Sequence, residues 1–403
     1  MASVFSTESE ARQALAGLRS GVAQVLGSLE GAPRHAAELA EQLELNKKLA
    51  WQIWRIGHAA DAGEVLAHVP GRSGFGLFLQ SVRGRVPAGL VDRLTEAWSQ
   101  VEDVARVHAG GRDDLAMMIR PRESAQREAA DLRYRKMAYT GFSHILGVQA
   151  RAHLSINVIV ANGDRVDVAL VSGLIDFRRL NESARVPIAR TGFADPRGAS
   201  HAPRGRGPLS PAPEGIDLPL LAEFSTRVEG LEGVDLGNGF LEVILGPGPT
   251  GNLSRGTVLM GELMRSAGSR YGEPDDRTAN LNAHVRVPCE TLIHDVYLRR
   301  EEFDAPDPGA LVFSEPSILN RALPQDGLPG RLEIDASVAP MGRGAVCGGT
   351  PVYEAYTPMA RRVFEHLGVD GSEFELYRLE LRYPPVYSLV NIRLDLPLER
   401  NEA

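Results

Sequence analysis

Residues 34–58, RHAAELAEQLELNKKLAWQIWRIGH, decide how the N-terminal part of this chain is expected to fold. Small and apolar side chains recur there at the three- and four-residue steps that place them on one face of a helix. The first helix, over about residues 34–43, would turn four such side chains inward: Ala36, Leu39, Ala40 and Leu43.

The segment Glu44-Leu45-Asn46 interrupts this first helix. Asn46 is a good N-cap for a second helix, because its side-chain oxygen can accept a hydrogen bond from the free amide of Lys48 or Leu49. The second helix would turn a new apolar face inward: Leu49, Ala50, Ile53 and Ile56. The pattern therefore predicts a helix-turn-helix.

The outer face of the second helix carries polar and basic side chains. Such side chains reach phosphates and base edges when a helix lies in the major groove of DNA. The sequence predicts contacts with double-stranded DNA from six residues at this face: Asn46, Lys47, Lys48, Trp51, Gln52 and Arg55.

This stretch resembles the helix-turn-helix of bacterial transcriptional regulators, including those of the winged-helix kind. The resemblance rests on small Ala40 within the first helix, apolar Leu45 after the turn, and Ala50 and Ile53 in the second helix. It covers residues 34–58 alone and implies a DNA-binding regulator. Glu44 occupies a position that is commonly glycine in that family.

Two tryptophans support a different interpretation, in which residues 34–58 form a helical hairpin that only packs within an all-helical bundle. Trp54 would join the inward face, whereas Trp51 stands beside the basic residues, where DNA-binding proteins more usually have a polar side chain. On this interpretation the chain is a self-assembling structural protein.

Composition and charge are those of an ordinary globular protein of more than one domain. The chain has 403 residues, of which 43% are hydrophobic and 24% charged, and its net charge is −8. This charge argues against a protein that coats nucleic acid with its whole surface. Residues 1–150 are nearly balanced, with 18 Lys and Arg against 17 Asp and Glu, so the acidic excess lies in the C-terminal part.

The chain carries no feature that predicts export or membrane insertion. Its start, MASVFSTESEARQ, lacks a secretory signal, and no apolar run approaches the length of a membrane span. Two cysteines, Cys289 and Cys347, are too few for a disulfide framework. We therefore expect a cytoplasmic protein without a membrane partner.

The remaining N-terminal residues also read as helices. A capping box at residues 7–10 would open a helix with an inward stripe of six residues: Ala11, Leu15, Leu18, Val22, Val25 and Leu29. Two short apolar segments, residues 65–69 and 75–82, flank a Gly-rich stretch whose glycines and Arg72 suit the tip of a wing. Residues 74–82 read equally well as a helix, so this segment suits either a wing or a further helix.

Two longer helices complete the N-terminal domain, which we place at residues 1–148. Pro87 would open the first of these, whose inward stripe comprises Leu90, Val91, Leu94, Trp98, Val101, Val104 and Val107. The second would span about residues 122–139 and is crowded with charges of both signs, which is typical of a solvated face.

The pattern changes to β-strands in residues 149–403. Residues 153–160 and 165–177 alternate as strands do, and the turn sequence at residues 161–164 predicts a hairpin. Further strands are expected at residues 240–246, 256–264, 283–288, 291–299, 310–315, 331–338, 374–383 and 388–396, with one helix at 359–367. The fold class is therefore α+β: an N-terminal helical bundle with a helix-turn-helix, followed by a β-rich domain of mainly antiparallel strands.

Residues 191–216 are rich in proline and glycine and predict a flexible loop within the β-rich domain. The stretch RGRG at residues 204–207 could touch nucleic acid as a flexible basic segment.

No residue set in the β-rich domain makes a convincing catalytic, metal or cofactor site. His284, Cys289 and His294, followed by Asp295, have a spacing that matches no common zinc site, and on one strand Cys289 would face away from both histidines. Cys347 lies in a Gly-rich turn without an identifiable base. The glycines of residues 246–251 lack the lysine of a phosphate-binding loop.

The sequence as a whole predicts a DNA-binding transcriptional regulator whose C-terminal domain self-associates or senses an unidentified ligand. The alternatives are the structural protein described above and an enzyme with its site in the β-rich domain. The third alternative would use Cys347 or the region of His284 and His294.

Overall fold

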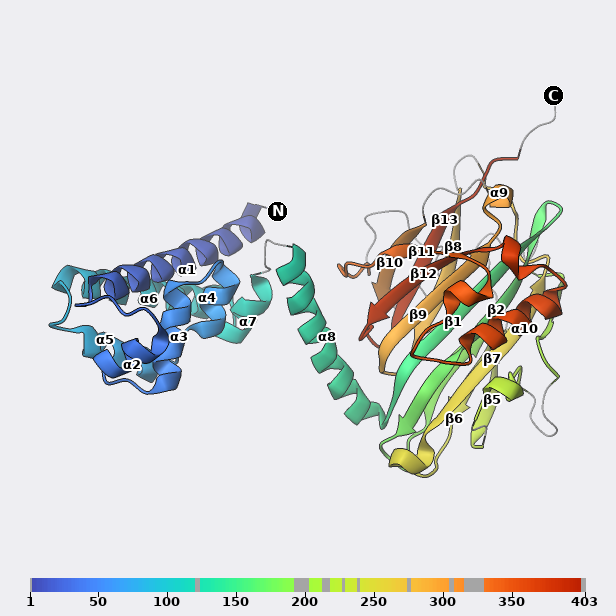
Figure 1. The fold of residues 1–403 in the computed structure, drawn as a ribbon, viewed down its shortest axis with the longest axis horizontal. Helices are drawn as coiled ribbons and strands as arrows, with labels where there is room; N and C mark the ends of the chain where they lie inside the picture. Colours follow the sequence, from blue (N-terminus) through green and yellow to red (C-terminus); the bar gives the residue numbers. More distant parts are fainter. Residues whose placement is uncertain are drawn as a thin grey trace. The chain divides into compact units, whose positions relative to one another are not determined.

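The chain folds into two compact units, Met1–Ala130 and Asp131–Ala403, called here the N-terminal and C-terminal units. The structure is a computed structural model, and it describes residues 2–119, 124–191, 203–211, 218–226, 229–237, 240–273, 277–303, 308–314 and 330–399. Helices come first and strands later (Figure 1), which confirms the α+β class. The division falls inside a helix, before the change of sequence pattern at residue 149.

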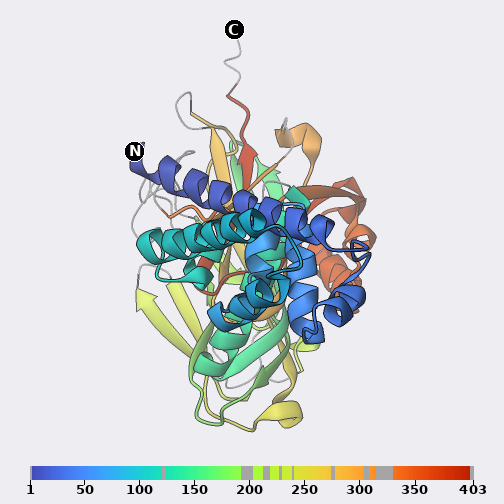
Figure 2. The ribbon, with the colours of Figure 1, turned by 90° about the vertical axis from the view of Figure 1, so that its left-hand side faces the viewer.

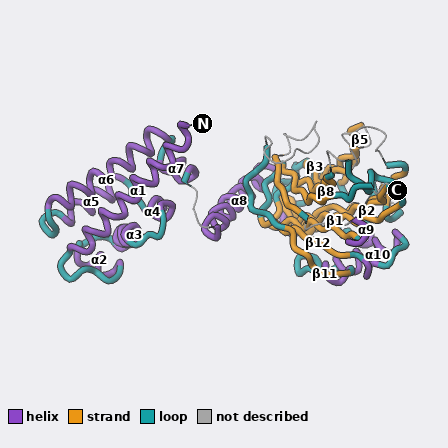
Figure 3. The backbone as a smooth tube through the Cα atoms, turned by 90° about the horizontal axis from the view of Figure 1, so that it is seen from above, coloured by secondary structure: helices purple, strands orange, loops and turns teal. Residues whose placement is uncertain are grey.

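The N-terminal unit is built from packed helices: α1 (Ala2–Ser28), α2 (Ala36–Gln42), α3 (Lys47–Gly57), α4 (Ala62–His68), α5 (Arg72–Val82), α6 (Ala88–His108) and α7 (Arg112–Met118). Helix α1 lies along α6 and also contacts α3 (Figures 2 and 3). The six residues of its expected stripe, from Ala11 to Leu29, are all buried. Burial of this stripe against α3 and α6 forms the core of the unit.

Two details of the N-terminal helices were wrongly predicted. Helix α1 begins at Ala2, so the capping box at residues 7–10 lies inside the helix; residues 2–6 contain no glycine or proline that would stop the helix. Val107 is 61% exposed, because it lies in the last turn of α6, beyond the buried Ala105.

The segment that suited either a wing or a helix is helical. Helices α4 and α5 occupy it, and no β-strand occurs within residues 2–119. Four apolar residues of α5 have helical spacing and are buried on one face: Phe75, Phe78, Leu79 and Val82. The β-hairpin wing of winged-helix proteins is therefore not formed in this stretch.

Helix α8 (Ser124–Leu146) leads into the long hairpin of β1 (Val148–Asn162) and β2 (Arg165–Arg179). The two strands pair antiparallel, with Asn162 opposite Arg165. Gly163 takes a left-handed φ of 65° in the turn, a conformation that glycine adopts without steric cost. The predicted hairpin is confirmed.

A seven-stranded sheet forms the centre of the C-terminal unit, in the order β11-β12-β9-β1-β2-β7-β4. The strands added to the hairpin are β4 (Gly205–Pro208), β7 (Gly256–Arg265), β9 (Cys289–Leu298), β11 (Val338–Arg343) and β12 (Glu375–Arg382). Strands β1 and β9 are parallel, and the other described pairings in this sheet are antiparallel.

Further layers cover the two faces of this sheet. Helix α10 (Tyr356–Leu367) packs on one face (Figure 1). A second sheet, β10 (Gly309–Ser314), β13 (Ser388–Asp395) and β8 (Thr278–Val285), packs on the other. A third sheet, β3 (Val186–Thr191), β6 (Phe240–Leu245) and β5 (Leu231–Gly237), packs against the ends of β1, β2 and β7, while short α9 (Arg300–Phe303) follows β9.

Two expectations for the C-terminal unit were wrong in detail. Residues 331–338 form no continuous strand, and only Val338 joins β11. The loop predicted at 191–216 lies largely outside the described residues, but its Gly205–Pro208 form β4 on the edge of β7. The Arg206 guanidinium donates to both carboxylate oxygens of Glu262, each at 2.8 Å. The described part of this basic stretch is therefore a paired strand.

Within the described part of the chain, no helix combines the length and the apolar content that a membrane crossing requires.

Candidate nucleic-acid interface

The turn between α2 and α3 closes although it lacks the usual glycine. Glu44 adopts a left-handed φ of 53°, which glycine tolerates better than any other residue. The Leu45 amide then donates to the Ala40 carbonyl oxygen at 3.0 Å, a bond that ends α2 and turns the chain. Glu44 is thus the strained residue of this turn.

Asn46 caps α3 as expected. Its side-chain oxygen accepts a hydrogen bond of 2.8 Å from the Leu49 amide, which satisfies one of the free donors at the start of the helix. The predicted inward face is buried against α1 and α2: Leu49, Ala50, Ile53 and Ile56. Packing of this face fixes which side of α3 is left exposed.

Lys47 and Lys48 lie in the first turn of α3, and both are exposed. Neither makes an ion pair or a side-chain hydrogen bond with any residue that the structure describes. The free amides at this end of the helix add to the positive potential of the two ammonium groups. This arrangement suits a phosphate.

Arg55 differs from the two lysines because its charge is compensated. Its guanidinium donates to the Glu64 carboxylate and lies 3.4 Å from the Nε2 atom of His68, and both of these residues belong to α4. Glu64 also accepts from the Ala60 amide at 2.8 Å, so the carboxylate is held in place. Burial and the neighbouring Arg55 lower the pKa of His68. Arg55 must exchange or share this partner in order to contact a phosphate.

Trp51 is 48% exposed, and its ring meets the His68 ring edge-on at a centroid distance of 4.8 Å. Gln52, the next residue, is partly exposed. Trp54 faces inward as predicted, packs on the core and stacks on His58 at 4.0 Å. The exposed side of α3 therefore combines two free cations, an amide and an aromatic ring.

Sequence reasoning identified the helix and its exposed residues but missed the contribution of α4. His68 comes from the segment that suited either a wing or a helix, and Glu64 directly precedes that segment. Their contact with α3 depends on α4 folding back along it, which a local pattern of residues does not reveal.

No protein-family model matches the chain, and no curated protein matches its sequence.

The three candidate metal-ligating residues of the C-terminal unit lie on two strands rather than on one. His284 lies on β8 in the second sheet, whereas Cys289 and His294 lie on β9. Cys289 is fully buried, and burial raises the pKa of its thiol to about 12. The Nε2–H group of His294 donates to the Leu281 carbonyl oxygen at 3.0 Å. No group of metal-ligating side chains converges within the described residues.

Cys347 lies in a short 3-10 helix, Ala345–Gly348, and its Sγ–H group donates to the Arg343 carbonyl oxygen at 3.0 Å. Among the residues that the structure describes, no histidine or carboxylate hydrogen-bonds to this sulfur. In the described part of the chain, the Cys347 sulfur is therefore not hydrogen-bonded to a base of the kind that activates a nucleophile.

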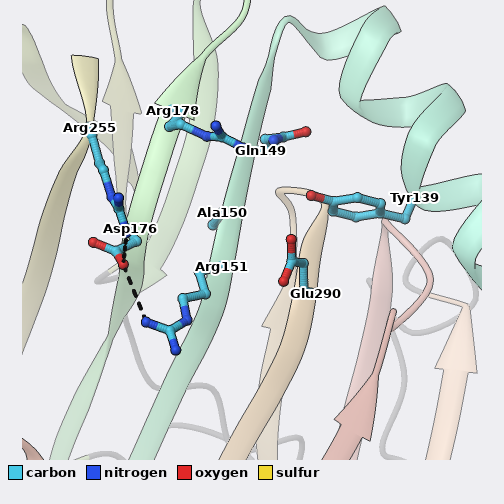
Figure 4. Close-up of a pocket in the computed structure, with 8 residues that line it drawn as sticks. All are labelled: Tyr139, Gln149, Ala150, Arg151, Asp176, Arg178, Arg255 and Glu290. Carbon is cyan, nitrogen blue, oxygen red and sulfur yellow. Dashed lines mark hydrogen bonds and ion pairs between the residues drawn. The ribbon is translucent and has the colours of Figure 1, made fainter. Parts of the chain in front are cut away.

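Two polar arrangements in the C-terminal unit were not predicted. One is a buried network around Asp295 and Arg378. The other is a polar hollow between α8 and the first strands (Figure 4). Their residues are distant in sequence, and arginine and glutamate are common enough in this chain that no local signal separates them from surface charges.

Proposed function

We propose that this protein binds double-stranded DNA through α3 and acts in the cytoplasm as a transcriptional regulator. The observation that carries the proposal is the pair of exposed cations, Lys47 and Lys48, at the positive end of a helix whose opposite face is buried. Anions bind favourably at such a helix end because free amides and positive charge act together.

The exposed residues of α3 suggest a division of roles. Lys47 and Lys48 contact phosphate, which positions the helix but does not read sequence. Gln52 lies one turn further along the same helix, and a glutamine amide can pair with the N6 and N7 atoms of adenine. Trp51 contributes apolar contact beside it, and Arg55 contacts phosphate after release from Glu64.

The C-terminal unit, in this proposal, provides self-association or ligand sensing. Many regulators bind DNA as symmetric dimers, so that two recognition helices meet two half-sites. A sheet with strand edges offers surfaces through which two copies can pair. We therefore expect a homo-oligomer.

The test of the proposal is a DNA titration of the full chain followed by fluorescence anisotropy of a labelled duplex. We expect affinity to fall steeply between about 50 and 200 mM salt. Replacing both lysines, Lys47→Ala with Lys48→Ala, should weaken binding to all duplexes and reduce the salt slope by about one for each lost phosphate contact.

A matched control removes two positive charges elsewhere in the same unit. Arg93 and Arg106 are exposed on α6, and their replacement by alanine should leave the salt slope unchanged. If the wild-type chain shows no salt-sensitive binding, or the α6 variant loses as much affinity as the α3 variant, the proposal fails.

Specificity is tested separately, with a selection from random duplexes. The variant Gln52→Ala should retain affinity for nonspecific DNA but lose discrimination of about 1–3 kcal/mol at one base position. An unchanged selected sequence would show that Gln52 does not read a base.

One observation favours the competing function, a protein contact at the same surface. Trp51 exposes a large aromatic ring, and tryptophan is enriched in the centre of protein interfaces. In that case the full chain would form a complex whose mass, measured by light scattering, decreases in Trp51→Ala, and the chain would show no affinity for DNA.

A further inference from the structure

A polar hollow of about 190 Å³ lies in the C-terminal unit (Figure 4). Its floor is formed by β1, β2 and the start of β9, and Tyr139 of α8 lies at its side. Pockets that hold drug-sized molecules range from about 300 to 1,000 Å³. The size of this hollow therefore suits a smaller ligand.

One wall of the hollow is already neutralised in part. Asp176 accepts from Arg255 at 2.7 Å and lies 3.6 Å from the guanidinium of Arg151, its cross-strand neighbour. These contacts, the Arg255 hydrogen bond first, lower the pKa of Asp176 and keep it ionised. Two arginines share one carboxylate, so this wall keeps a net positive charge.

Asp176 reaches this position through a local distortion of β2. Its φ is 51°, in the left-handed region, and it lies where the register between β2 and β7 shifts. A bulge of this kind redirects a side chain, and strained residues of this kind occur often at binding sites.

Three other side chains at the hollow, those of Arg178, Gln149 and Tyr139, offer hydrogen-bond donors. Arg178 stands directly opposite Gln149 in the β1–β2 pairing. Across the described residues, neither of these side chains nor the Tyr139 hydroxyl makes a hydrogen bond or an ion pair. Burial, followed by the charge of Glu290, raises the pKa of Tyr139 to about 12, so its hydroxyl remains a donor at neutral pH. A planar guanidinium with an adjacent amide and hydroxyl fits a carboxylate well.

Glu290 supplies a charge of the opposite sign at the same hollow. It is exposed on β9, and its carboxylate has no ion-pair partner in the described chain. Strand β1 lies between β9 and β2, so these two backbones are two strand spacings apart, about 10 Å. The registers place Glu290 level with Arg151, two residues along β1 from Gln149, and the long side chain of Arg178 reaches across part of this separation. Figure 4 shows the hydroxyl end of Tyr139 directed toward Gln149 and Glu290.

From this arrangement we infer that the hollow binds a small zwitterion of the α-amino-acid class. The ligand carboxylate pairs with Arg178 and accepts from Gln149 and Tyr139, while its ammonium group pairs with Glu290. A ligand with anionic groups alone would be repelled by Glu290, and a ligand with cationic groups alone would be repelled by Arg178. The inference goes beyond DNA binding by α3 and does not depend on it.

The experiment measures binding of small probes to the full chain by isothermal titration calorimetry and thermal shift. The probes are the twenty common amino acids one at a time, propionate and ethylamine as the two halves of alanine, and inorganic phosphate. We expect at least one amino acid to bind with a defined Kd, and to bind about tenfold or more tightly than either half-probe or phosphate, because it alone satisfies both charged walls.

Two variants test which residue binds the carboxylate of the ligand and which binds its ammonium group. Arg178→Gln should raise the Kd of the amino acid by about tenfold or more. Glu290→Gln should weaken the amino acid as well but leave propionate binding unchanged or tighter, because it removes the repelling carboxylate. Two control variants on α10, Arg362→Gln and Glu365→Gln, make the same charge changes at an exposed site. They should alter neither the Kd of the amino acid nor the Kd of propionate.

The inference is overturned if no amino acid binds the wild-type chain, or if Arg178→Gln binds normally. It is also overturned if phosphate or propionate binds best and Glu290→Gln tightens it, since the hollow would then be a simple anion site. Far-UV circular dichroism of each variant shows whether it is folded, and Glu290 is exposed enough for its amide variant to fold.

Discussion

Arg378 and Asp295 form a two-pronged ion pair inside the C-terminal unit, with Nε–Oδ1 and Nη2–Oδ2 distances of 2.8 and 2.7 Å. Tyr356 also donates to Asp295, and Arg378 donates to the Gly348 carbonyl oxygen at 2.7 Å. These contacts join β9 and β12 to α10 and to the segment before it. Both charged groups are buried, so each depends on the other.

Breaking this pair from one side should destabilise the C-terminal unit strongly. We expect Asp295→Ala to lower the free energy of unfolding by about 3–5 kcal/mol, because it leaves a buried guanidinium without its partner. The double variant Asp295→Leu with Arg378→Met should recover much of this loss. Urea unfolding followed by circular dichroism measures both values.

The control is Arg362→Ala, which breaks exposed ion pairs and should change the free energy of unfolding by less than about 1 kcal/mol. If Arg362→Ala destabilised the chain as much as Asp295→Ala, burial of the pair would not explain the loss.

The turn between α2 and α3 gives a prediction for the N-terminal unit. Replacing Glu44 by glycine should raise the free energy of unfolding by about 0.5–1 kcal/mol, since glycine relieves the left-handed strain but gains freedom in the unfolded chain. All three tryptophans lie in this unit, so fluorescence in urea follows it selectively. The same change at Glu41, inside α2, should instead be destabilising by about 1 kcal/mol.

Two buried histidines predict that the C-terminal unit loses stability in mild acid. Burial lowers the pKa of His153 to about 3 and also lowers that of His294. In the unfolded chain both titrate near 6.5. Below that pH the unfolded state binds protons that the folded state does not. The contribution of these histidines to the free energy of unfolding is therefore fully present above pH 6.5, and it is lost as the pH falls toward their pKa values in the folded state. Each histidine adds a slope of up to about 1.4 kcal/mol per pH unit.

Urea unfolding at several pH values between 7.5 and about 5 measures this slope. The variant His153→Gln should reduce it, because glutamine does not titrate and can still hydrogen-bond to Ser172. An exposed histidine on α10, His366, serves as the control, and its replacement should leave the slope unchanged. A flat profile in the wild-type chain would contradict the prediction.

The contact between Arg55 and Glu64 predicts a gain of DNA affinity. Glu64→Gln removes the compensating charge but retains an acceptor for the Ala60 amide. If α3 binds DNA, Arg55 then becomes available for a phosphate, and the salt slope should steepen by about one. Glu96→Gln on α6 makes the same charge change at an exposed position. Equal gains in both variants would show only a general charge effect.

Much of the local structure was determined by the sequence alone. The cap at Asn46, the inward face from Leu49 to Ile56 and the hairpin turn at Gly163 were all predictable. Each depends on contacts between residues a few positions apart, where side-chain chemistry and the period of the element decide the outcome. The sequence likewise placed Lys47 and Lys48 on the exposed side of α3.

Only the tertiary structure decided which charges are free and which are paired. The sequence predicts Arg55 and Lys47 alike as exposed basic residues of α3, yet in the folded chain α4 places Glu64 beside Arg55. Asp295 pairs with Arg378 because β9 lies beside β12, and Arg178 and Glu290 line one hollow because β1 joins β2 to β9. Such pairs form between residues far apart in the chain, and strand order and helix packing, which no local pattern encodes, determine which side chains meet.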